Sequence, residues 1–305
     1  MSKQKIVIIV GPTASGKTSL AVQLAKKFNG EIISADSMQV FKEMNIGTAK
    51  VTTDEMQGIN HYLINVVSPT QSFNVSMWKE LAEKSIVEIA TKKCLPIVVG
   101  GTGLYINALI NDFTFGNCES DPLVRNKYEE FLKKNGVDEL FNLLEKRDKE
   151  ASKLVDKNRT RVVIRYLEIL DNGGDPKKIE KNHKYDYLLL GLAPQREDLY
   201  NAINLRVDKM IDNGLIDEVK SLIAKYGQEK LLQSGLAIGY KEVIDYLNDM
   251  QSLEKTIELI KQHSRNYAKR QITYLKKLPN IIWVNFDDKE NIIKLVNNFL
   301  EKEYE

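Results

Sequence analysis

The feature that most constrains the fold of this chain is a short glycine-containing segment near its N-terminus. Residues Gly11–Thr18 read GPTASGKT, which matches the pattern GxxxxGK[ST]. The segment follows the apolar run Ile6–Val10 and precedes a helical pattern over Thr18–Phe28. In this context glycines let backbone N–H groups converge on phosphate oxygens at a helix N-terminus, while the lysine adds charge and the Thr hydroxyl can bind Mg²⁺. We therefore predict Mg²⁺ as cofactor and a phosphate-binding loop made of Gly11, Pro12, Thr13, Ala14, Ser15, Gly16, Lys17 and Thr18, with Thr18 as the metal ligand.

Further apolar runs alternate with helical patterns along the chain. Their composition is typical of strands buried on both faces, and they are Glu31–Ser34, Pro96–Val99, Tyr187–Leu192 and Ile281–Phe286. Strands that alternate with helices predict an α/β fold, here a P-loop NTPase-like doubly wound parallel sheet. The stretch from Arg196 to Lys277 is mostly helical in pattern, so we expect a helical C-terminal half.

The stretch from 117 to 184 differs from the rest of the chain. It is charged, has almost no strand-like runs, and repeats apolar residues at helical spacing, namely Leu123, Tyr128, Phe131, Leu132, Leu140, Phe141, Leu143 and Leu144. We predict that residues 117–184 form a helical insertion domain. The P-loop core would then consist of residues 1–116 and 185–305.

The composition excludes several classes of protein. The chain has 305 residues, of which 43% are apolar and 28% charged, values near the average for soluble globular proteins. Cys94 and Cys118 form no CxxC pair, and no apolar run is long enough for a signal segment or a membrane span. We therefore expect a cytoplasmic protein without disulfides, a zinc site or a membrane contact.

Asp36 is the first candidate for a reacting side chain. It follows the predicted strand Glu31–Ser34, and the carboxyl ends of strands in an open α/β sheet face the ligand crevice. The bland alternative is that Asp36 and Gln39 form an N-terminal capping box of a helix. The predicted strand Pro96–Val99 ends in Gly-Gly-Thr instead of an acid, which argues against an ATP-hydrolysing motor or switch.

The chain has two basic clusters, although its net charge is only +2. Lys261–Lys277 carries six Lys/Arg residues and no acid, and on a helix Lys261, Arg265, Lys269 and Lys276 would share one stripe beside Tyr267 and Tyr274. A solvated helix face is the usual explanation of such a run. The second cluster, Lys157, Arg159, Arg161 and Arg165, lies in the predicted insertion. Together the clusters favour a polyanionic partner.

The segments resemble, in order and over nearly the whole chain, those of the tRNA dimethylallyltransferase (tRNA isopentenyltransferase) family. The matching segments are GPTASGKT, ADSMQVF at Ala35–Phe41, IGTAK at Ile46–Lys50, VVGGTGLY at Val98–Tyr105, DPLVR at Asp121–Arg125, LRVDKMIDNGLIDEV from Leu205, AIGYKE from Ala237 and YAKRQITY from Tyr267. The chain departs from the usual family pattern at Tyr166, Ser264 and Tyr274.

The resemblance implies transfer of a dimethylallyl group from its diphosphate to the exocyclic N6 amine of the adenosine immediately 3′ of the anticodon. It implies Asp36, Lys17, Thr18 and Arg206 as catalytic residues, with Asp36 as the base. It also implies that a monomer binds dimethylallyl diphosphate and the tRNA anticodon stem-loop. The implied tRNA-binding residues are Asp36, Ser37, Met38, Gln39, Thr102, Arg125, Arg161, Arg165, Gly239, Tyr240, Lys241, Arg265, Lys269, Arg270 and Gln271.

Three alternatives stay open at this point. A P-loop nucleoside or nucleotide kinase shares the strand–loop–helix start and an acid after the second strand, but it does not explain the basic clusters. A non-enzymatic RNA-binding module does not explain an intact P-loop. An adenylate isopentenyltransferase acts on free nucleotides, and the basic clusters and the large insertion favour tRNA over that substrate.

Overall fold

The computed structural model describes residues 3–111, 121–176, 184–231 and 234–302. The chain divides into two compact units, the first made of Met1–Ile110 with Lys184–Glu305 and the second of Asn111–His183. The predicted insertion, 117–184, covers most of the second unit, although its first boundary, at residues 116 and 117, lies outside the described residues.

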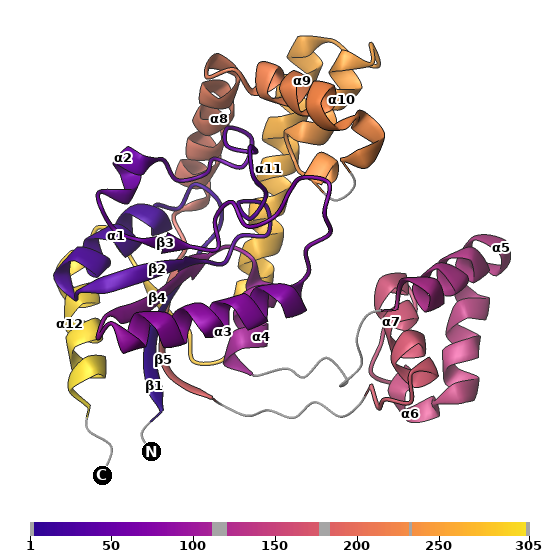
Figure 1. The fold of residues 1–305 in the computed structure, drawn as a ribbon, viewed down its shortest axis with the longest axis horizontal. Coiled ribbons are helices and arrows are strands. Elements are labelled where there is room, and N and C mark those ends of the chain that lie inside the picture. Colours follow the sequence, from indigo (N-terminus) through magenta and orange to yellow (C-terminus); the bar gives the residue numbers. More distant parts are fainter. Residues whose placement is uncertain (1–2, 112–120, 177–183, 232–233, 303–305) are drawn as a thin grey trace. The chain divides into compact units, whose positions relative to one another are not determined.

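The first unit is built on a parallel sheet (Figure 1). Within the described residues its six strands lie in the order β3-β2-β4-β1-β5-β6, and all of the pairs are parallel. The bounds are β1 Gln4–Val10, β2 Gly30–Ser34, β3 His61–Tyr62, β4 Leu95–Gly100, β5 Tyr185–Leu192 and β6 Ile282–Val284. The predicted α/β parallel sheet is confirmed. The edge strand β3 was not predicted, because two residues carry no readable periodicity.

The central strand β1 is buried on both faces because it is a run of β-branched residues. Side chains of a strand alternate between the two faces of the sheet. Val7 and Ile9 accordingly join one core, and Ile6, Ile8 and Val10 join the other. The register pairs Val10 with Gly100 of β4 and with Gly191 of β5. The loops after these strands therefore leave the sheet at the same edge.

Helices cover both faces of the sheet (Figure 1). One face packs against α1 (Lys17–Lys27) and α12 (Lys289–Glu301) through residues such as Leu20, Leu24, Ile292 and Val296. The other face packs against α3 (Val75–Thr91) and α4 (Gly103–Ile110) through Trp78, Ile86 and Ile106. This arrangement is the doubly wound layering that the sequence predicts.

The C-terminal half adds α8 (Arg196–Asp212), α9 (Leu215–Tyr226), α10 (Tyr240–Leu247) and α11 (Leu253–Leu275). Helix α11 packs along α8 and reaches back to α4. Short elements are α2 (Thr53–Met56) and the 3-10 turns Gln228–Lys230 and Ser234–Leu236. Among the described helices, none combines the length and the apolar character that crossing a membrane requires.

The second unit is helical and has its own core. Helices α5 (Pro122–Arg147), α6 (Lys149–Ser152) and α7 (Thr160–Asp171) surround Tyr128, Leu140, Leu144, Val163 and Leu167. Asp121 caps α5 by accepting hydrogen bonds from the amides of Leu123 and Val124. Helix α5 is interrupted at Gly136, whose φ of 83° lies in the left-handed region.

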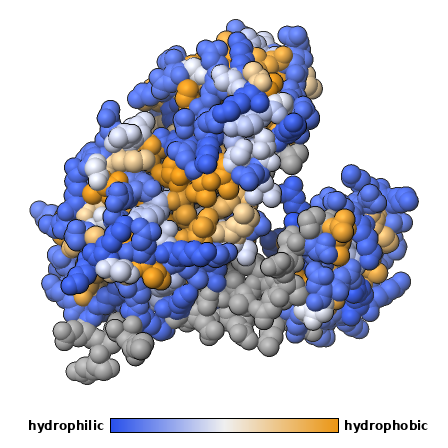
Figure 2. Space-filling view, in the orientation of Figure 1, coloured by the Kyte–Doolittle hydropathy of each residue, from blue (hydrophilic) through white to orange (hydrophobic). Residues whose placement is uncertain are grey.

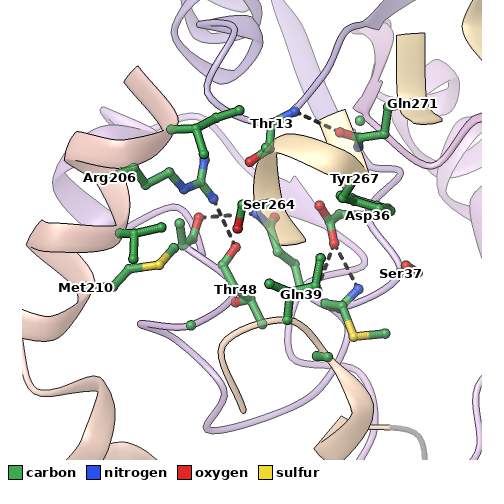
Figure 3. A pocket seen from close by; sticks show the side chains of 18 of the residues that line it. Thr13, Asp36, Ser37, Gln39, Thr48, Arg206, Met210, Ser264, Tyr267 and Gln271 are labelled. Atoms are coloured by element: carbon green, nitrogen blue, oxygen red, sulfur yellow. Dashed lines mark hydrogen bonds between the residues drawn. The ribbon is translucent and has the colours of Figure 1, made fainter. Parts of the chain in front are cut away.

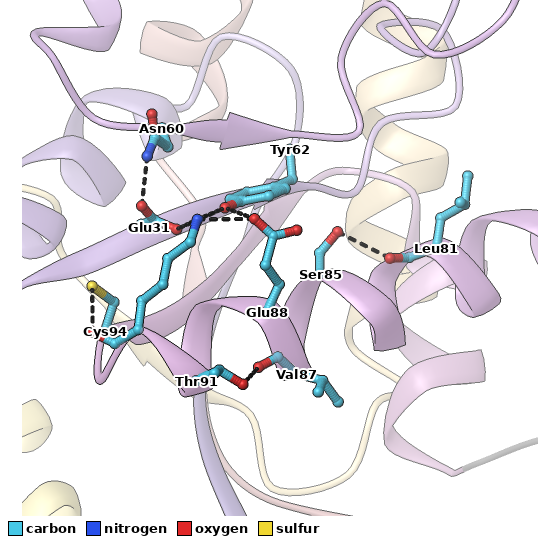
Figure 4. Close-up of polar contacts among 10 residues, drawn as sticks. Glu31, Asn60, Tyr62, Leu81, Ser85, Val87, Glu88, Thr91 and Cys94 are labelled. Carbon is cyan, nitrogen blue, oxygen red and sulfur yellow. Dashed lines mark hydrogen bonds and ion pairs between the residues drawn. The ribbon is translucent and has the colours of Figure 1, made fainter.

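A polar network at the amino end of β2 joins the edge strand β3 to α3 (Figure 4). The Tyr62 hydroxyl donates to Glu31 Oε2 over 2.8 Å, and Lys92 Nζ lies 2.6 Å from the same hydroxyl. Burial raises the pKa of Tyr62 to about 12. The network pairs polar groups at the sheet edge.

Figure 2 shows hydrophobic side chains gathered near the middle of the visible face of the first unit, with hydrophilic ones around them.

Candidate active site

The P-loop connects β1 to α1 in the context that the sequence predicts. Gly16 precedes α1 with φ 81°, a conformation that favours glycine. Gly11 allows the loop to lie against β5, because a Cβ there would be 2.9 Å from the Leu192 carbonyl oxygen and 2.6 Å from Ser15 Oγ. The Ser15 hydroxyl is buried and has no hydrogen-bond partner among the described residues. The loop therefore presents polar groups at the N-terminus of α1.

A cavity of about 360 Å³ lies at the carboxyl edge of the sheet, and all four predicted catalytic residues line it (Figure 3). Its volume falls in the range of small-molecule sites. Its polar lining comes from the P-loop, from the segment after β2 and from α8 and α11. These residues are Thr13, Lys17, Thr18, Asp36, Ser37, Gln39, Arg206, Arg270 and Gln271.

Lys17 and Arg206 give the cavity its positive charge. Burial, and secondarily the neighbouring Arg206 guanidinium, lower the pKa of Lys17 to about 8, while Asp36 acts in the opposite direction. Burial also lowers the pKa of Arg206, although an arginine stays charged at neutral pH. Lys17 Nζ donates to the Pro12 carbonyl over 2.7 Å, and Arg206 Nη2 donates to the Thr48 carbonyl over 3.4 Å. Two cations in one cavity suit a multiply charged anion.

Asp36 faces these cations from the loop after β2. Its Oδ1 accepts hydrogen bonds from the amides of Met38 (2.8 Å) and Gln39 (3.3 Å). The residues after Asp36 form a turn and not a helix. Of the capping-box alternative only the bond from the Gln39 amide to Asp36 is present. The Gln39 side chain bonds instead to Ser34 and to the Ala49 carbonyl. Among the described residues Oδ2 has no hydrogen-bond partner. Asp36 therefore combines a fixed orientation with an oxygen that can accept a proton.

A second turn supports the Asp36 turn. Thr102, between β4 and α4, accepts a hydrogen bond from the Ser37 amide over 3.1 Å, and its own amide donates to the Ala35 carbonyl over 3.2 Å. Tyr267 of α11 also lines the cavity. Burial raises its pKa to about 12, with contacts to Thr102 and Ser37 acting against this shift. Thr102 thus lies beside the segment that holds Asp36.

Gln271 of α11 connects two loops of the sheet edge. Its Oε1 accepts a hydrogen bond from the Thr13 amide over 2.9 Å, and its Nε2 donates to the Gly101 carbonyl over 3.1 Å. A Cβ at position 101 would lie 2.1 Å from Gln271 Nε2, so Gln271 holds this position only beside a glycine. Only an amide side chain supplies one acceptor and one donor in this geometry.

Part of the cavity lining is an apolar wall. It is formed by Ile203, Val207 and Met210 of α8, by Leu236, Ala237 and Ile238, and by Ile260 of α11. Leu236 is 68% exposed, so the apolar wall extends toward the opening of the cavity. A ligand with an anionic end and a short hydrocarbon end would match the cationic and the apolar residues of this cavity.

The donor set fits Mg²⁺ better than a transition metal. Within the described residues no group of three or more His, Cys, Asp or Glu side chains could hold a metal ion. Thr18 and Asp36 bring oxygen donors to the cavity wall. Mg²⁺ prefers such hard oxygen ligands, and it commonly binds through one or two protein groups together with substrate phosphates.

Comparison with known proteins gives the family. The model of the family described as IPP transferase matches residues 39–278 of the chain. This chain belongs to the IPP transferase family. The tRNA dimethylallyltransferase of Acetivibrio thermocellus is 43% identical over 304 residues, with 97% of each chain covered. The enzyme of the same name from Thermoanaerobacter sp. is 45% identical over 305 residues, with 97% of this chain and 96% of that chain covered.

Solved structures of IPP transferases are similar over the same length. The full-length tRNA isopentenylpyrophosphate transferase of Bacillus halodurans is 43% identical with a TM-score of 0.75, and the match covers 98% of this chain and 97% of that one. A eukaryotic dimethylallyltransferase, described as acting on tRNA, is 30% identical with a TM-score of 0.84. That match covers 97% of this chain and 79% of the eukaryotic chain. The sequence resemblance is thereby confirmed.

The basic residues of α11 in this IPP transferase do not form one continuous stripe. Lys261 pairs with Asp208 of α8 over 2.7 Å. Arg265 donates to Asn204 Oδ1 over 2.6 Å and lies in a separate open hollow with Arg196 and Tyr200. Lys269 and Arg270 are exposed, and Arg270 also lines the cavity. Lys269 and Arg270 are therefore better candidates for contact with a polyanion than the paired Lys261 and Arg265.

The segment Gly239–Lys241 lies behind the cavity wall. Tyr240 is only 2% exposed, and its hydroxyl donates to Glu218 Oε1 over 2.6 Å. Its buried ring therefore gives no support to the predicted contact between Tyr240 and tRNA. Gly239 begins α10 with φ 96°, and Lys241 is exposed.

The arginines of the second unit have different surroundings. Arg125 Nη2 lies 2.9 Å and Arg165 Nη1 3.1 Å from Oε2 of Glu168, a fully buried carboxylate. Arg161 is exposed. Arg125 and Arg165 therefore neutralise a buried charge whatever else they contact, whereas Arg161 faces solvent.

Sequence reasoning missed the loop Asn45–Ala49 as part of this site. Gly47, Thr48 and Ala49 line the cavity, although the segment IGTAK suggested no chemistry by itself. The apolar wall was also missed, since its residues come from three separate segments. The sequence held one indication of this loop, namely that IGTAK is among the segments that resemble the family.

Proposed function

We propose that this IPP transferase transfers the dimethylallyl group of dimethylallyl diphosphate to the N6 amine of the adenosine immediately 3′ of the tRNA anticodon. The observation that carries the proposal is a single cavity that combines the cations Lys17 and Arg206, the Asp36 carboxylate and an apolar wall. The names of the similar enzymes support dimethylallyl and tRNA as the two substrate classes. We further propose that the chain acts as a monomer in the cytoplasm.

The diphosphate is the proposed ligand of the P-loop. Its oxygens would accept hydrogen bonds from the backbone amides of Ala14–Thr18 and lie beside Lys17 and Arg206. The loop amides begin at Ala14 because Pro12 has no N–H and the Thr13 amide donates to Gln271. When the allylic C–O bond breaks, negative charge develops on the departing pyrophosphate. Fixed cations aimed at that position stabilise the transition state more than the ground state.

The amine attacks the carbon from which pyrophosphate departs. A C–N bond forms as the C–O bond breaks, and the N6 nitrogen loses one proton. The amine is a weak nucleophile, because its lone pair is delocalised into the adenine ring. We assign Asp36 Oδ2 as the acceptor of that proton, because Oδ1 is occupied by the Met38 and Gln39 amides.

The acceptor base must leave its stack to enter the cavity. We propose that Ser37, Met38, Gln39 and Thr102 surround the flipped adenine, since they line the cavity or support the Asp36 turn. Gln271 would keep the P-loop and the Gly101 turn in register. Lys269 and Arg270, with Arg161 of the second unit, are proposed to contact tRNA phosphates.

Mg²⁺ bound through Thr18 and diphosphate oxygens would neutralise part of the charge on the leaving group. The remaining steps need only the side chains already described. The apolar wall of Ile203, Val207 and Met210 would hold the hydrocarbon and keep water from the allylic carbon.

The test is nucleoside mass spectrometry of tRNA incubated with the protein, Mg²⁺ and dimethylallyl diphosphate in the absence of ATP. We expect one adenosine of the tRNA to gain a dimethylallyl group. AMP in a parallel reaction separates this activity from an adenylate isopentenyltransferase, and we expect it to react far more slowly. A phosphorylated product that depends on ATP would instead identify a kinase.

A further inference from the structure

The loop Asn45–Ala49 is attached to the helical C-terminal half through one carboxylate. Glu218 of α9 accepts hydrogen bonds from the amides of Asn45 and Ile46 on Oε2, each over 2.8 Å, and from the amide of Gly47 on Oε1 over 3.2 Å. The Tyr240 hydroxyl donates to Oε1 over 2.6 Å. Three consecutive amides and a hydroxyl thus converge on one acid, although Glu218 lies outside the cavity.

The geometry explains why a carboxylate and a glycine stand at these positions. An ionised carboxylate only accepts hydrogen bonds, so it can satisfy four donors at once. An amide in its place has one accepting oxygen and turns an NH₂ group toward N–H donors. At Gly47 a Cβ would lie 2.4 Å from Cε2 of Tyr240, so the loop approaches α10 only without a side chain.

The same loop presents its carbonyls to the cavity. The Thr48 carbonyl accepts from Arg206 Nη2 over 3.4 Å, and the Ala49 carbonyl accepts from Gln39 Nε2 over 3.3 Å. Figure 3 shows Arg206, Thr48 and Gln39 around the same space. The next residue, Lys50, anchors the end of the loop through the Phe41 carbonyl and Asn65 Oδ1, each over 2.6 Å. A shift of the loop would therefore displace the acceptor that orients the Arg206 guanidinium.

We propose that Glu218 is a positioning residue that sets the Arg206 guanidinium for the pyrophosphate leaving group through the loop Asn45–Ala49. The proposal rests on the proposed function for the identity of the leaving group. It requires only that the cavity binds a diphosphate at Lys17 and Arg206.

The first variant is Glu218→Gln, which keeps the size of the side chain but removes an accepting oxygen. We expect kcat and the affinity for inorganic pyrophosphate each to fall about 10- to 100-fold, as small misplacements of a binding group do. The KM for tRNA should stay near its wild-type value. The matched control is Glu43→Gln, because Glu43 also joins a loop to α9, through Lys225 and Tyr226, but does not line the cavity.

A double-mutant cycle with Arg206→Lys separates positioning from general destabilisation. Lysine keeps the positive charge and lacks the second guanidinium nitrogen that bonds Thr48. We expect Glu218→Gln to cost less than about threefold in the Arg206→Lys background. Equal losses in the two backgrounds, or a folded Glu218→Gln protein with wild-type rate and pyrophosphate affinity, would overturn the proposal.

Tyr240→Phe keeps the experiment decisive if Glu218→Gln does not fold. It preserves the buried ring and removes one donor to Glu218. We therefore expect a smaller loss of kcat and pyrophosphate affinity than in Glu218→Gln, and this loss should likewise shrink in the Arg206→Lys background. Pyrophosphate titration measures this coupling without any prenyl transfer, so an inactive wild type would contradict the proposed function alone. A wild-type protein that does not bind pyrophosphate would overturn both.

Discussion

The two carboxylate oxygens of Asp36 have different surroundings. Oδ1 holds the turn through two backbone amides, and Oδ2, which has no hydrogen-bond partner among the described residues, is the oxygen that we propose as the base. Because one side chain can do both, the capping and catalytic interpretations could not be separated from sequence. An asparagine at this position can still accept the two amide hydrogen bonds through its oxygen, but it cannot act as a base.

Asp36→Asn should therefore lower kcat by roughly 10²–10⁴-fold, the usual contribution of a general base. Affinity for dimethylallyl diphosphate should change little, because the cations that bind it are unaltered. Steady-state kinetics and a diphosphate titration measure the two quantities. Asp249→Asn, at an exposed turn position with φ 57°, is the control and should match the wild type. Near-wild-type turnover of Asp36→Asn would leave Asp36 as a structural residue only.

The pKa of Lys17 predicts how the affinity for a diphosphate depends on pH. Burial lowers this pKa to about 8, so the ammonium of the free protein loses its proton as the pH rises through that value. Since a diphosphate binds the charged form, its affinity should fall by about tenfold per pH unit above pH 8. Calorimetric titration of pyrophosphate from pH 6.5 to 9.5 tests this.

Lys17→Arg is the comparison, because arginine stays charged over this range. The titration of pyrophosphate itself is common to both proteins and drops out of their ratio. An unchanged ratio of affinities across the range would contradict a lowered Lys17 pKa.

The residues of the P-loop and Asp36 could be recognised from sequence, because each directly follows a run of strand-forming residues. Glu218 could not, because its contacts with Asn45 and Tyr240 depend on how α9, α10 and the loop pack in three dimensions. The burial of Tyr240 had no sequence signal for the same reason.

At the scale of elements, α11 carries both the structural and the proposed RNA-binding contacts of the C-terminal half. One side packs along α8 through Ala268, which touches the core residues Leu199 and Ile203. Gln271 reaches the P-loop and Lys269 is exposed. The sequence predicted a basic helix, but it could not show that Lys261 pairs with Asp208, since that contact spans two helices.

Substitutions of Gln271 test whether its hydrogen bonds from α11 hold the P-loop in its binding conformation. Gln271→Leu removes both hydrogen bonds and should destabilise the protein by about 1–3 kcal/mol, because the part-buried Thr13 amide and the buried Gly101 carbonyl lose their partner. Gln271→Glu keeps the acceptor for Thr13 and places an oxygen against the Gly101 carbonyl. Both should bind pyrophosphate more weakly than the wild type.

Urea unfolding and pyrophosphate titration provide the two measurements for Gln271. Thr273→Val, at an exposed position of the same helix whose hydroxyl bonds only to the Lys269 carbonyl, controls for surface substitution on α11. Wild-type pyrophosphate affinity in Gln271→Leu would show that the P-loop holds its shape without α11.

At the scale of the whole molecule, the chain consists of two units with separate cores. The helical spacing of apolar residues predicted the second unit well, because Tyr128, Leu140 and Leu144 do form its core. Leu123 was grouped with them and is 80% exposed, since it lies in the first turn of α5. Periodicity indicates a helix but does not fix where packing begins.

The division into two units predicts that the first unit binds dimethylallyl diphosphate and that the second unit contributes much of the affinity for tRNA. Replacing residues 111–183 with a short Gly/Ser linker should leave a folded first unit that binds dimethylallyl diphosphate, while tRNA binding falls much more. Circular dichroism checks folding, and separate titrations measure each substrate. Arg161→Gln is the milder companion variant, because Arg161 is exposed whereas Arg125 and Arg165 neutralise the buried Glu168. Normal tRNA binding by the folded deletion protein would remove the second unit from the RNA interface.

We infer that the P-loop cavity serves prenyl transfer and not phosphoryl transfer. The most direct measurement follows pyrophosphate and modified adenosine together, in a reaction of the protein with an anticodon stem-loop, dimethylallyl diphosphate and Mg²⁺, with no ATP present. We expect the two products to appear in equal amounts, and the rates of both to fall together by roughly 10²–10⁴-fold in Asp36→Asn. Phosphate transfer that requires ATP, or pyrophosphate released without any prenylated adenosine, would contradict it.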